Sequence, residues 1–467
     1  MRNRRVRGVV IGLVAVACVA VPATVLAFGG PTPGQATLDK KLRVGVDNDG
    51  RPWYLGGFSA LFPLDASGHS FVTVTDRGPN DDITCNGVAG KVIFVPAFTP
   101  RLIYFSVQNG KIAIDRVKPM RVGNELASGI ANLPTDENSF SSSCKPLPND
   151  PFGVDTEGIS LDPRANLRSH DRHKGVFWVS DEYRPSILLM TARGELLARI
   201  VPKGATGDAY AAAVAQAQAD SGDSLDVIEG FPAIVGDRFR KNRGFEDVAT
   251  QRFHGRTYVY TSLQSPMENP NTTTRNSLAI RVFRIDVTNV AHPVVDREWA
   301  ALLDIKPGKK SPLSDKVSAL WPAGPDKLLI EERDDTISSD PAASTKIYEV
   351  DFTHATNLLG GVYDQPATSP TLEQQYIPTA DGVVPPNPAG VTPGQKSLCI
   401  DVNAALTANG LVNTKLEGVS VLGSGSHATL AAINDNDFDL AHVTNPAANP
   451  TSNPTTIDFV PLPAGCS

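Results

Sequence analysis

Three short segments of this chain are near copies of one another, and two further segments are weaker relatives. They read TEGIS (156–160), FEDVA (245–249), LEGVS (416–420), GFSAL (57–61) and KVSAL (316–320). A unit of this kind cannot bury a hydrophobic core alone, so repeated units stack on their neighbours. This repetition constrains the fold more strongly than any property of the composition.

Each segment is followed, after about 10–20 residues, by a run that is typical of a β-strand. The runs are SFVTVTDRGPN (70–80), GVFWVSDEYRP (175–185), TYVYTSLQSP (257–266), KLLIEERDD (327–335) and TLAAINDNDFD (429–439). Four of the five runs end in acidic residues, and the third ends in Gln264 instead. Hairpin turns such as QNGK and ARGE lead into further apolar runs. The repeated unit is therefore a glutamate-bearing strand, an acid-ended strand and one or two outer strands.

Radial stacking of such units protects their edges, so the repeat predicts an all-β fold of the β-propeller type. We expect six blades: five repeats are visible, and a sixth comes from the chain termini or from an insertion. The repeats lie further apart than a minimal blade of roughly 40–50 residues. Loop insertions and one inserted helix, at 207–223, account for the excess. A pair of β-sandwiches is the alternative architecture.

The chain opens with a basic start, an apolar run and a small-residue end, which predict a secretory signal peptide cleaved after Ala27 or Ala23. The expected parts are a signal peptide (1–27), a linker (28–41), the propeller domain (42–443) and a C-terminal tail (444–467) held by a disulfide. Cleavage removes four arginines and no acids, which takes the net charge from −7 to −11 and argues against a nucleic-acid partner. No later apolar run reaches the roughly 20 residues of a membrane helix. We therefore expect a secreted monomer without a transmembrane segment.

Four cysteines remain in the mature chain: Cys85, Cys144, Cys399 and Cys466. An even number of cysteines in an exported protein indicates two disulfides. The sequence allows three pairings, and we favour Cys85–Cys144 and Cys399–Cys466 because these residues are neighbours along the chain.

Acidic residues recur at two places in the repeat. In a propeller the first strand of every blade lines the central channel, so Glu157, Glu246 and Glu417 would converge near its mouth. The polar strand ends expected to join them are Asp76, Asp181, Glu182, Glu331, Glu332, Asp334, Asn434, Asp435 and Asp437. Carboxylates packed this closely need a compensating cation, and their oxygens suit calcium. A single acidic strand end often just forms a turn, but recurrence in four units favours a shared site.

Arginines alternate with these acids: Arg77 in TDRGPND, Arg184 in SDEYRP and Arg333 in EERDD. Phosphate-ester chemistry uses such a mixed pocket, because a metal activates water while arginines hold phosphoryl oxygens. The alternative is that each arginine only pairs with the acid beside it. The sequence contains no G-x-S-x-G motif, P-loop or dinucleotide fingerprint.

Several of these motifs together resemble a known family, the phytase-like domain named for the "esterase-like activity of phytase". The motifs are DTEGIS, VFWVSDEYRPSI, GFEDVA, LLIEERDD, LEGVSVL and NDNDF, and the resemblance covers about residues 42–440. It implies a β-propeller and a proposed phosphoesterase activity, which is inferred for the family mainly from its many glutamates and aspartates. The chain departs from the family at Arg184, where glycine is more usual, so a functional role for this arginine is not implied.

We therefore expect a secreted, calcium-dependent phosphoesterase that acts on phytate-like or other phosphomonoesters. The expected calcium ligands or bases are Glu157, Asp181, Glu182, Glu246 and Glu417. Arg77 and Arg333 would hold the phosphate, and the remaining polar strand ends would complete the metal site. One alternative is a calcium-dependent carboxylester or lactone hydrolase, which Asn434 and Asn436 would fit. The other is a non-enzymatic binding propeller with a structural metal.

Overall fold

The computed structural model describes residues 34–38, 42–166, 175–379, 381–385, 387 and 390–466. The expected signal peptide lies outside this part of the chain. Within it, no helix is both long enough and apolar enough to cross a membrane.

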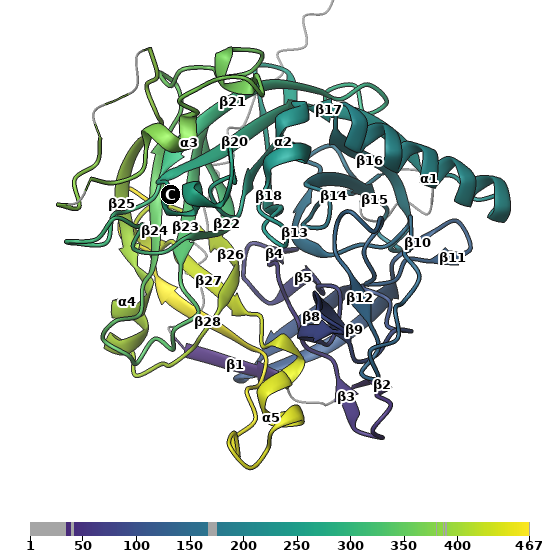
Figure 1. Cartoon of the computed structure of the whole chain (residues 1–467). Helices are drawn as coiled ribbons and strands as arrows, with labels where there is room; N and C mark the ends of the chain where they lie inside the picture. Colours follow the sequence, from purple (N-terminus) through teal and green to yellow (C-terminus); the bar gives the residue numbers. More distant parts are fainter. Residues whose placement is uncertain are drawn as a thin grey trace, which may run out of the picture.

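Most of the strands belong to five antiparallel units of about four strands that are arranged in a ring (Figure 1). Unit 1 contains β4 (Phe62–Pro63), β5 (Ser70–Val74), β8 (Arg101–Gln108) and β9 (Lys111–Pro119). Unit 2 contains β13 (Thr156–Leu161), β14 (Phe177–Asp181), β15 (Ser186–Met190), β16 (Leu196–Pro202) and a parallel fifth strand, β17 (Asp226–Phe231). Unit 3 contains β18 (Phe245–Phe253), β19 (Arg256–Leu263), β20 (Ala279–Asp286) and β21 (Val294–Leu302). Unit 4 contains β22 (Lys316–Gly324), β23 (Lys327–Arg333), β24 (Thr345–Asp351) and β25 (Gln395–Asp401). Unit 5 contains β26 (Leu416–Leu422), β27 (Thr429–Asn434), β28 (Thr456–Pro461) and β1 (Gly34–Leu38).

The first strands of the units lie nearest the centre of Figure 1 and contact one another in the order β4, β13, β18, β22, β26 and back to β4. Five hydrophobic clusters fill the spaces between neighbouring units. Between units 5 and 1, for example, Phe71 and Phe105 pack with Ile433 and Phe459. A mostly β, propeller-like fold is therefore present. The part of the chain that the structure describes forms five such units, so the expected sixth blade stays unconfirmed.

The chain termini close the ring. β1, from the expected linker, pairs with β28, from the expected tail, so the folded domain extends beyond both predicted bounds. The two last residues of β1 also pair in parallel with β9 of unit 1 and join units 5 and 1 into one eight-stranded sheet. The predicted disulfide pairing is confirmed, with Cα–Cα distances of 5.3 Å for Cys85–Cys144 and 5.5 Å for Cys399–Cys466.

Helices, 3₁₀ turns and small sheets lie outside the five units. The helices are α1 (Ala205–Ser221), α2 (Ala233–Arg238), α3 (Leu372–Gln375), α4 (Val402–Ala408) and α5 (Leu440–Thr444), and α1 is the helix expected at 207–223. The 3₁₀ turns are η1 (Thr272–Asn276), η2 (Val362–Asp364), η3 (Gly425–His427) and η4 (Asp437–Asp439). The small sheets are β2 (Arg43–Val46) with β3 (Pro52–Tyr54), β10 (Arg121–Val122) with β11 (Glu125–Leu126), and β6 (Asn80–Cys85) with β7 (Val88–Ile93) and β12 (Ser139–Phe140).

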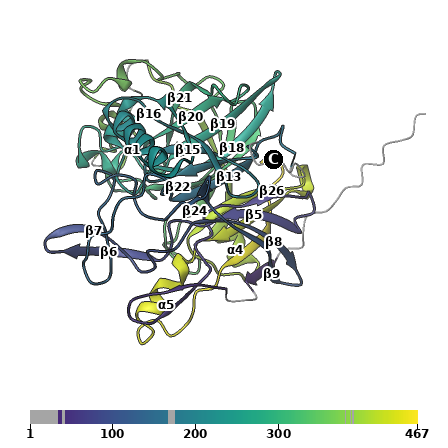
Figure 2. The same ribbon diagram turned by 90° about the vertical axis from the view of Figure 1, so that its right-hand side faces the viewer.

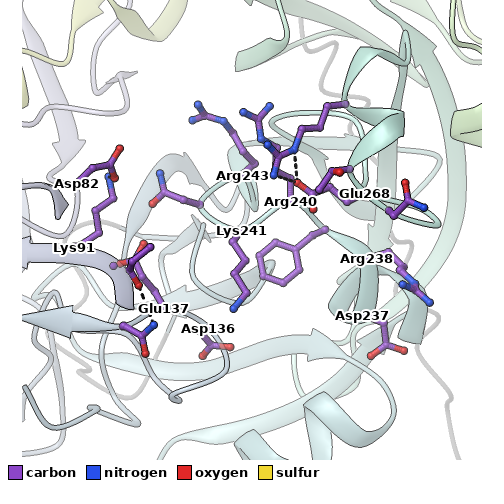
Figure 3. Close-up of a pocket in the computed structure, with 18 of the residues that line it drawn as sticks. Asp82, Lys91, Asp136, Glu137, Asp237, Arg238, Arg240, Lys241, Arg243 and Glu268 are labelled. Atoms are coloured by element: carbon purple, nitrogen blue, oxygen red, sulfur yellow. Dashed lines mark hydrogen bonds and ion pairs between the residues drawn. The ribbon is translucent and has the colours of Figure 1, made fainter. Parts of the chain in front are cut away.

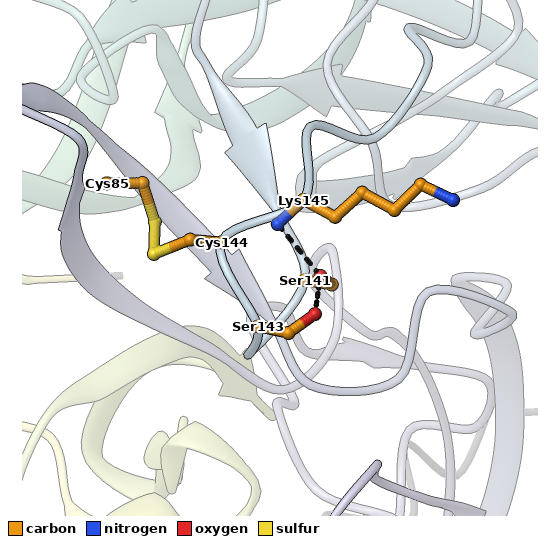
Figure 4. The surroundings of a disulfide bond; sticks show 5 residues. All are labelled: Cys85, Ser141, Ser143, Cys144 and Lys145. Carbon is orange, nitrogen blue, oxygen red and sulfur yellow. Dashed lines mark hydrogen bonds between the residues drawn. A yellow bond between two sulfur atoms is a disulfide. The ribbon is translucent and has the colours of Figure 1, made fainter.

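The β6–β7 hairpin projects from the ring on the same side as α5 (Figure 2). Its tip is anchored by the Cys85–Cys144 disulfide to a tight turn (Figure 4). In that turn the Lys145 amide donates to Ser141 Oγ, at 3.2 Å. The hairpin is thereby held in place over one face of the ring.

Asp458 on β28 supplies a pH test of the ring closure. Its side chain is 1% exposed and accepts hydrogen bonds from Gln35 on β1 (2.8 Å) and Asn413 (2.6 Å). Burial raises its pKa to about 6, although both hydrogen bonds act in the opposite direction. Because the folded-state pKa lies above the unfolded value of about 3.9, protonation stabilises the folded state, and this stabilisation is lost as the pH rises through 6.

We therefore expect Asp458→Asn to gain stability relative to the wild type as the pH rises from 4 to 7, by about 2–3 kcal/mol. Urea unfolding of both proteins at several pH values measures the difference, and all other titrating groups cancel in it. A difference that does not change with pH would contradict a raised pKa at Asp458.

Candidate active site

The repeated glutamates all occupy β-bulges in the first strands of their units. Pairing with the second strand shifts register around Glu157, Glu246 and Glu417, which therefore lack a directly paired partner. The corresponding shift in β22 contains Ser318. A bulge redirects a side chain away from the regular face of a strand. Here the bulges bring the three glutamates to one end of the central channel, where they are at most 8% exposed.

A second position repeats at the end of each second strand. In each second strand, one residue pairs with the first strand just before the bulge. These residues are Thr75, Asp181, Leu263, Glu332 and Asn434 in units 1 to 5. The next residue along each strand lines a central cavity; these residues are Asp76, Glu182, Gln264, Arg333 and Asp435. Successive side chains of a strand point to opposite faces, so only one of each adjacent pair can face the cavity.

The cavity has a volume of about 480 Å³ and is lined by residues from all five units. Glu157 and Glu417 are 260 residues apart in the sequence, yet the charge of Glu417 contributes to raising the pKa of Glu157. The expected convergence of acids from distant repeats is thus present in the structure.

Asp155, Glu157 and Glu182 form the tightest acidic group, and all three belong to unit 2. One carboxylate oxygen from each lies within 4.8 Å of the others. Arg77, from unit 1, forms ion pairs with Asp155 and, at 3.0 Å, with Glu182. Glu157 has no hydrogen-bond or ion-pair partner among the described residues, so its carboxylate is available to a ligand.

The opposite side of the cavity carries cations. Arg333 donates to Ser318 Oγ at 2.6 Å, forms an ion pair with Glu417 and lies 3.7 Å from Glu246. Lys415 forms ion pairs with Asp435 and Asp437. Two more cations, Lys316 and Arg243, also line the cavity; Lys316 pairs with Asp335, and Arg243 donates to Gln264 Oε1 at 2.6 Å.

Burial and mutual repulsion raise the pKa values of the central acids. Burial raises the pKa of Glu182 to about 7, with Asp155 adding to the shift and Arg77 opposing it. The pKa of Glu157 is raised well above its usual range by burial and then by Asp155, Glu246 and Glu182. The pKa of Glu246 is raised in the same way, by burial and by Glu417. A site of this kind holds protons near neutral pH unless a cation replaces them.

Two of the acids expected in the site point away from the cavity. Asp181 is fully buried behind it, pairs with Arg199 at 2.9 Å and accepts a hydrogen bond from the Tyr183 amide. Glu332 pairs with Lys396 and accepts from the Asp304 amide. Both occupy the outward position of their strands, so strand alternation places them in supporting networks.

The other expected ligands outside the cavity are Glu331, Asp334 and Asn434. Asp334 accepts from the amides of Thr336 and Ser344 and so stabilises a turn, while Asn434 accepts from the Thr456 amide. Glu331 is 1% exposed; burial raises its pKa to about 8, and neither of its carboxylate oxygens has a hydrogen-bond partner.

Two more side chains have structural roles. Arg184 pairs with Asp136 at 2.7 Å and stacks on Tyr210. These contacts give it a supporting role, and the family resemblance implied no functional role for it. Asn436 accepts from the Gly57 amide and donates to the Asn453 carbonyl.

Sequence reasoning missed Asp155, Lys316, Lys415 and Arg243. The first three share one position, directly before the paired residue that precedes the bulge. This position carries either charge, so it is not visible as an acidic repeat. The signal available in the sequence was that each of these three charged residues lies at the same place relative to the repeated segment.

The ring and its charged channel mouth define a propeller-like protein with an acidic, cation-containing pocket. A family model described as "Phytase-like: Esterase-like activity of phytase" matches residues 54–438. The chain therefore belongs to this family. No curated protein matches it.

A search of solved structures finds a proposed oxidoreductase (glucose dehydrogenase) from Thermus thermophilus, with 9% identity. The alignment covers 91% of this chain and all of the other, with a TM-score of 0.28. At this score the likeness carries no conclusion.

The Asp181–Arg199 pair tests the supporting role assigned to Asp181. Both side chains are fully buried, so Arg199→Met should leave an uncompensated carboxylate and cost about 3–5 kcal/mol of unfolding free energy. Arg256→Met, which removes the exposed partner of Asp286, should cost far less, because exposed ion pairs contribute little to stability. Urea unfolding compares the two variants. Equal, small losses would contradict a buried supporting pair.

Proposed function

We propose that this protein is a secreted, monomeric, calcium-dependent phosphoesterase that hydrolyses phosphate esters at the channel mouth of a five-bladed propeller. The observation that carries the proposal is the placement of a buried three-carboxylate group opposite a cluster of cations in one cavity. Family membership supports an esterase of the phytase-like kind. Two disulfides are consistent with an exported protein.

The residues present fit a calcium ion. Asp155, Glu157 and Glu182 would hold it, because hard oxygen ligands at short mutual distance suit this cation. The unpartnered carboxylate of Glu157 and the raised pKa values of Glu157 and Glu182 are features that a bound cation would relieve. When bound, calcium would supply charge neutralisation and a more acidic water.

The cationic side of the cavity would bind the phosphoryl oxygens. Arg333 and Arg77 were expected in this role, and the structure adds Lys316 and Arg243 as candidates. Arg77 is already shared by Asp155, Glu182 and Glu137, so we assign it to holding the acidic group in place. Arg333 also pairs with Glu417 and Asp335, and Lys316 with Asp335, so these two would exchange carboxylate partners for phosphate oxygens. Arg243 has no carboxylate partner among the described residues. Together the three cations would favour a dianionic phosphomonoester.

Hydrolysis would need a proton acceptor for the attacking water. Glu246 and Glu417 each keep one buried carboxylate oxygen without a hydrogen-bond partner. Either could take the proton as the water oxygen bonds to phosphorus and the ester P–O bond breaks. The same glutamic acid then gives this proton to the leaving oxygen, which completes the reaction and restores the carboxylate.

The carboxylester or lactone alternative drew support from Asn434 and Asn436. Both side chains are engaged by backbone groups and neither lines the cavity. The phosphoesterase proposal is therefore preferred over this alternative.

Phosphate release is the direct test. The mature protein should release phosphate from p-nitrophenyl phosphate or phytate with calcium, and much less with a chelator. Arg333→Met should lower kcat/KM for the phosphate ester by about 100-fold or more, since removing one charge-stabilising donor typically costs 10²–10³. Hydrolysis of p-nitrophenyl acetate without phosphate release would support the carboxylester alternative, and no turnover of either would leave a binding propeller.

Calcium binding has a separate readout in thermal melting. Calcium should raise the melting temperature of the wild type, because a ligand bound only to the folded state stabilises it. Glu157→Gln/Glu182→Gln should abolish this shift. The variant should not be less stable without calcium, since the charges removed have raised pKa values.

Glu417→Gln/Asp435→Asn is the matched control, because it removes two acids from the opposite side of the same cavity. Those acids already pair with Arg333 and Lys415, so most of the calcium shift should remain. Loss of the shift only in this control would place the calcium site away from unit 2.

A further inference from the structure

A second, larger cavity adjoins the central cavity, which we refer to as the acidic cavity. Its volume is about 1180 Å³, and it shares four lining residues with the acidic cavity: Asp82, Lys91, Asn242 and Arg243. We refer to it as the trough. The β6–β7 hairpin, with Asp82 and Lys91, lies on one side of the trough, and Asp237, Arg238 and Glu268 lie on the other (Figure 3). The segment 237–243, which is the end of α2 and the loop after it, brings Lys241 between the two sides.

Nearly all carboxylates that line the trough are already neutralised. Their ion pairs are Asp82 with Lys91 (2.8 Å), Asp136 with Arg184 (2.7 Å), Glu137 with Arg77 (2.8 Å) and Glu268 with Arg275 (2.5 Å). Among the carboxylates of the described residues that line the trough, only Asp237 lacks an ion-pair partner. The acids of the trough therefore leave little free negative charge.

Three cations of the segment 237–243 have no carboxylate partner among the described residues. Arg238 donates to the Pro270 carbonyl at 3.1 Å, and Arg243 donates to the Gln264 side chain. Lys241 is exposed, has no such partner at all, and lies between the two sides of the trough in Figure 3. Arg240, by contrast, pairs with Asp315 at 2.7 Å. The trough thus carries a surplus of positive charge that continues through Arg243 into the acidic cavity.

We propose that the trough binds the chain of a linear polyanion with a phosphate in each repeat, whose terminal phosphate enters the acidic cavity. The proposal rests on the proposed phosphoesterase function and narrows its substrate class. A single phosphomonoester would use only the acidic cavity and leave the unpaired cations of the trough without a role. An open trough between two sides, with cations at the end of α2 and along the loop that follows it, matches an extended chain carrying repeated charges.

Isothermal titration calorimetry with a linear inorganic polyphosphate of defined length tests the trough. Arg238→Gln/Lys241→Gln should weaken polyphosphate binding by about tenfold or more, because charge-assisted contacts to phosphate are lost. Orthophosphate, which fits the acidic cavity alone, should bind the variant and the wild type equally. Arg256→Gln removes an arginine that lines neither cavity and should bind both probes as the wild type does.

Unchanged polyphosphate affinity in the double variant would overturn the proposal, as would an equal loss of orthophosphate binding. A poly(glycerol phosphate) chain serves as a second probe, and tighter binding of one polymer identifies its linkage, anhydride or diester, as the preferred source. Binding of neither polymer would also overturn the proposal.

Because these measurements need no turnover, they separate the two proposals. Polymer binding through the trough without phosphate release from any ester would defeat only the proposed function. Hydrolysis of small esters, with polymer binding insensitive to the double variant, would defeat only the trough.

Discussion

Carboxylates outnumber cations at the mouth of the channel, and this imbalance governs the chemistry of the site. Among the described residues, ten acidic and six basic side chains line the central cavity, and the acids at its centre are almost completely buried. Like charges held this closely in a poorly hydrated space can remain ionised only if cations compensate them. Arg77, Arg333 and Lys415 supply part of this compensation through their ion pairs. The group formed by Asp155, Glu157 and Glu182 remains undercompensated, and a bound cation would supply the missing positive charge.

The ring makes this imbalance possible. Each unit alone would place its acids at a solvated strand end, where charge costs little. Closure through β1, which pairs with both β28 and β9, gathers those strand ends around one axis. The hydrophobic clusters between units stabilise the ring and so hold the charges together. The packing between units therefore stabilises the fold and also holds the mutually repelling carboxylates of the site close together.

The strand pattern and the recurrence of the acids could be predicted from the sequence for a physical reason. A repeat that lines a channel must carry the same local geometry each time, so TEGIS, FEDVA and LEGVS indicate both the strand and its bulge. The pairing of the cysteines also followed from proximity along the chain. What could not be predicted was which of two adjacent acids faces the cavity. Asp181 and Glu182 are neighbours of the same type, and only the register with Thr156 separates the buried supporting residue from the lining one.

The cations posed a different difficulty. Lys316 and Lys415 occupy the position that carries Asp155 in unit 2, so no recurring residue type marks them. Asn434 and Asn436 looked like ligands because amide oxygens can bind calcium, yet nearby backbone amides use those oxygens first. The sequence does not show which side-chain oxygens will accept hydrogen bonds from backbone amides once the loops are folded. Likewise, the strands β1 and β28 lay in stretches expected to be a linker and a tail. A strand that closes the ring can be recognised only when the distant strand with which it pairs is known.

The most direct test of a cation-compensated channel mouth is a crystal structure of the mature protein grown with calcium and soaked with phosphate. Anomalous scattering would locate calcium independently of any activity. We expect a calcium ion bound by Asp155, Glu157 and Glu182, with phosphate oxygens against Arg333 and Lys316. Calcium bound elsewhere in the protein, with the carboxylates of unit 2 hydrogen-bonded to one another and to water, would contradict this expectation.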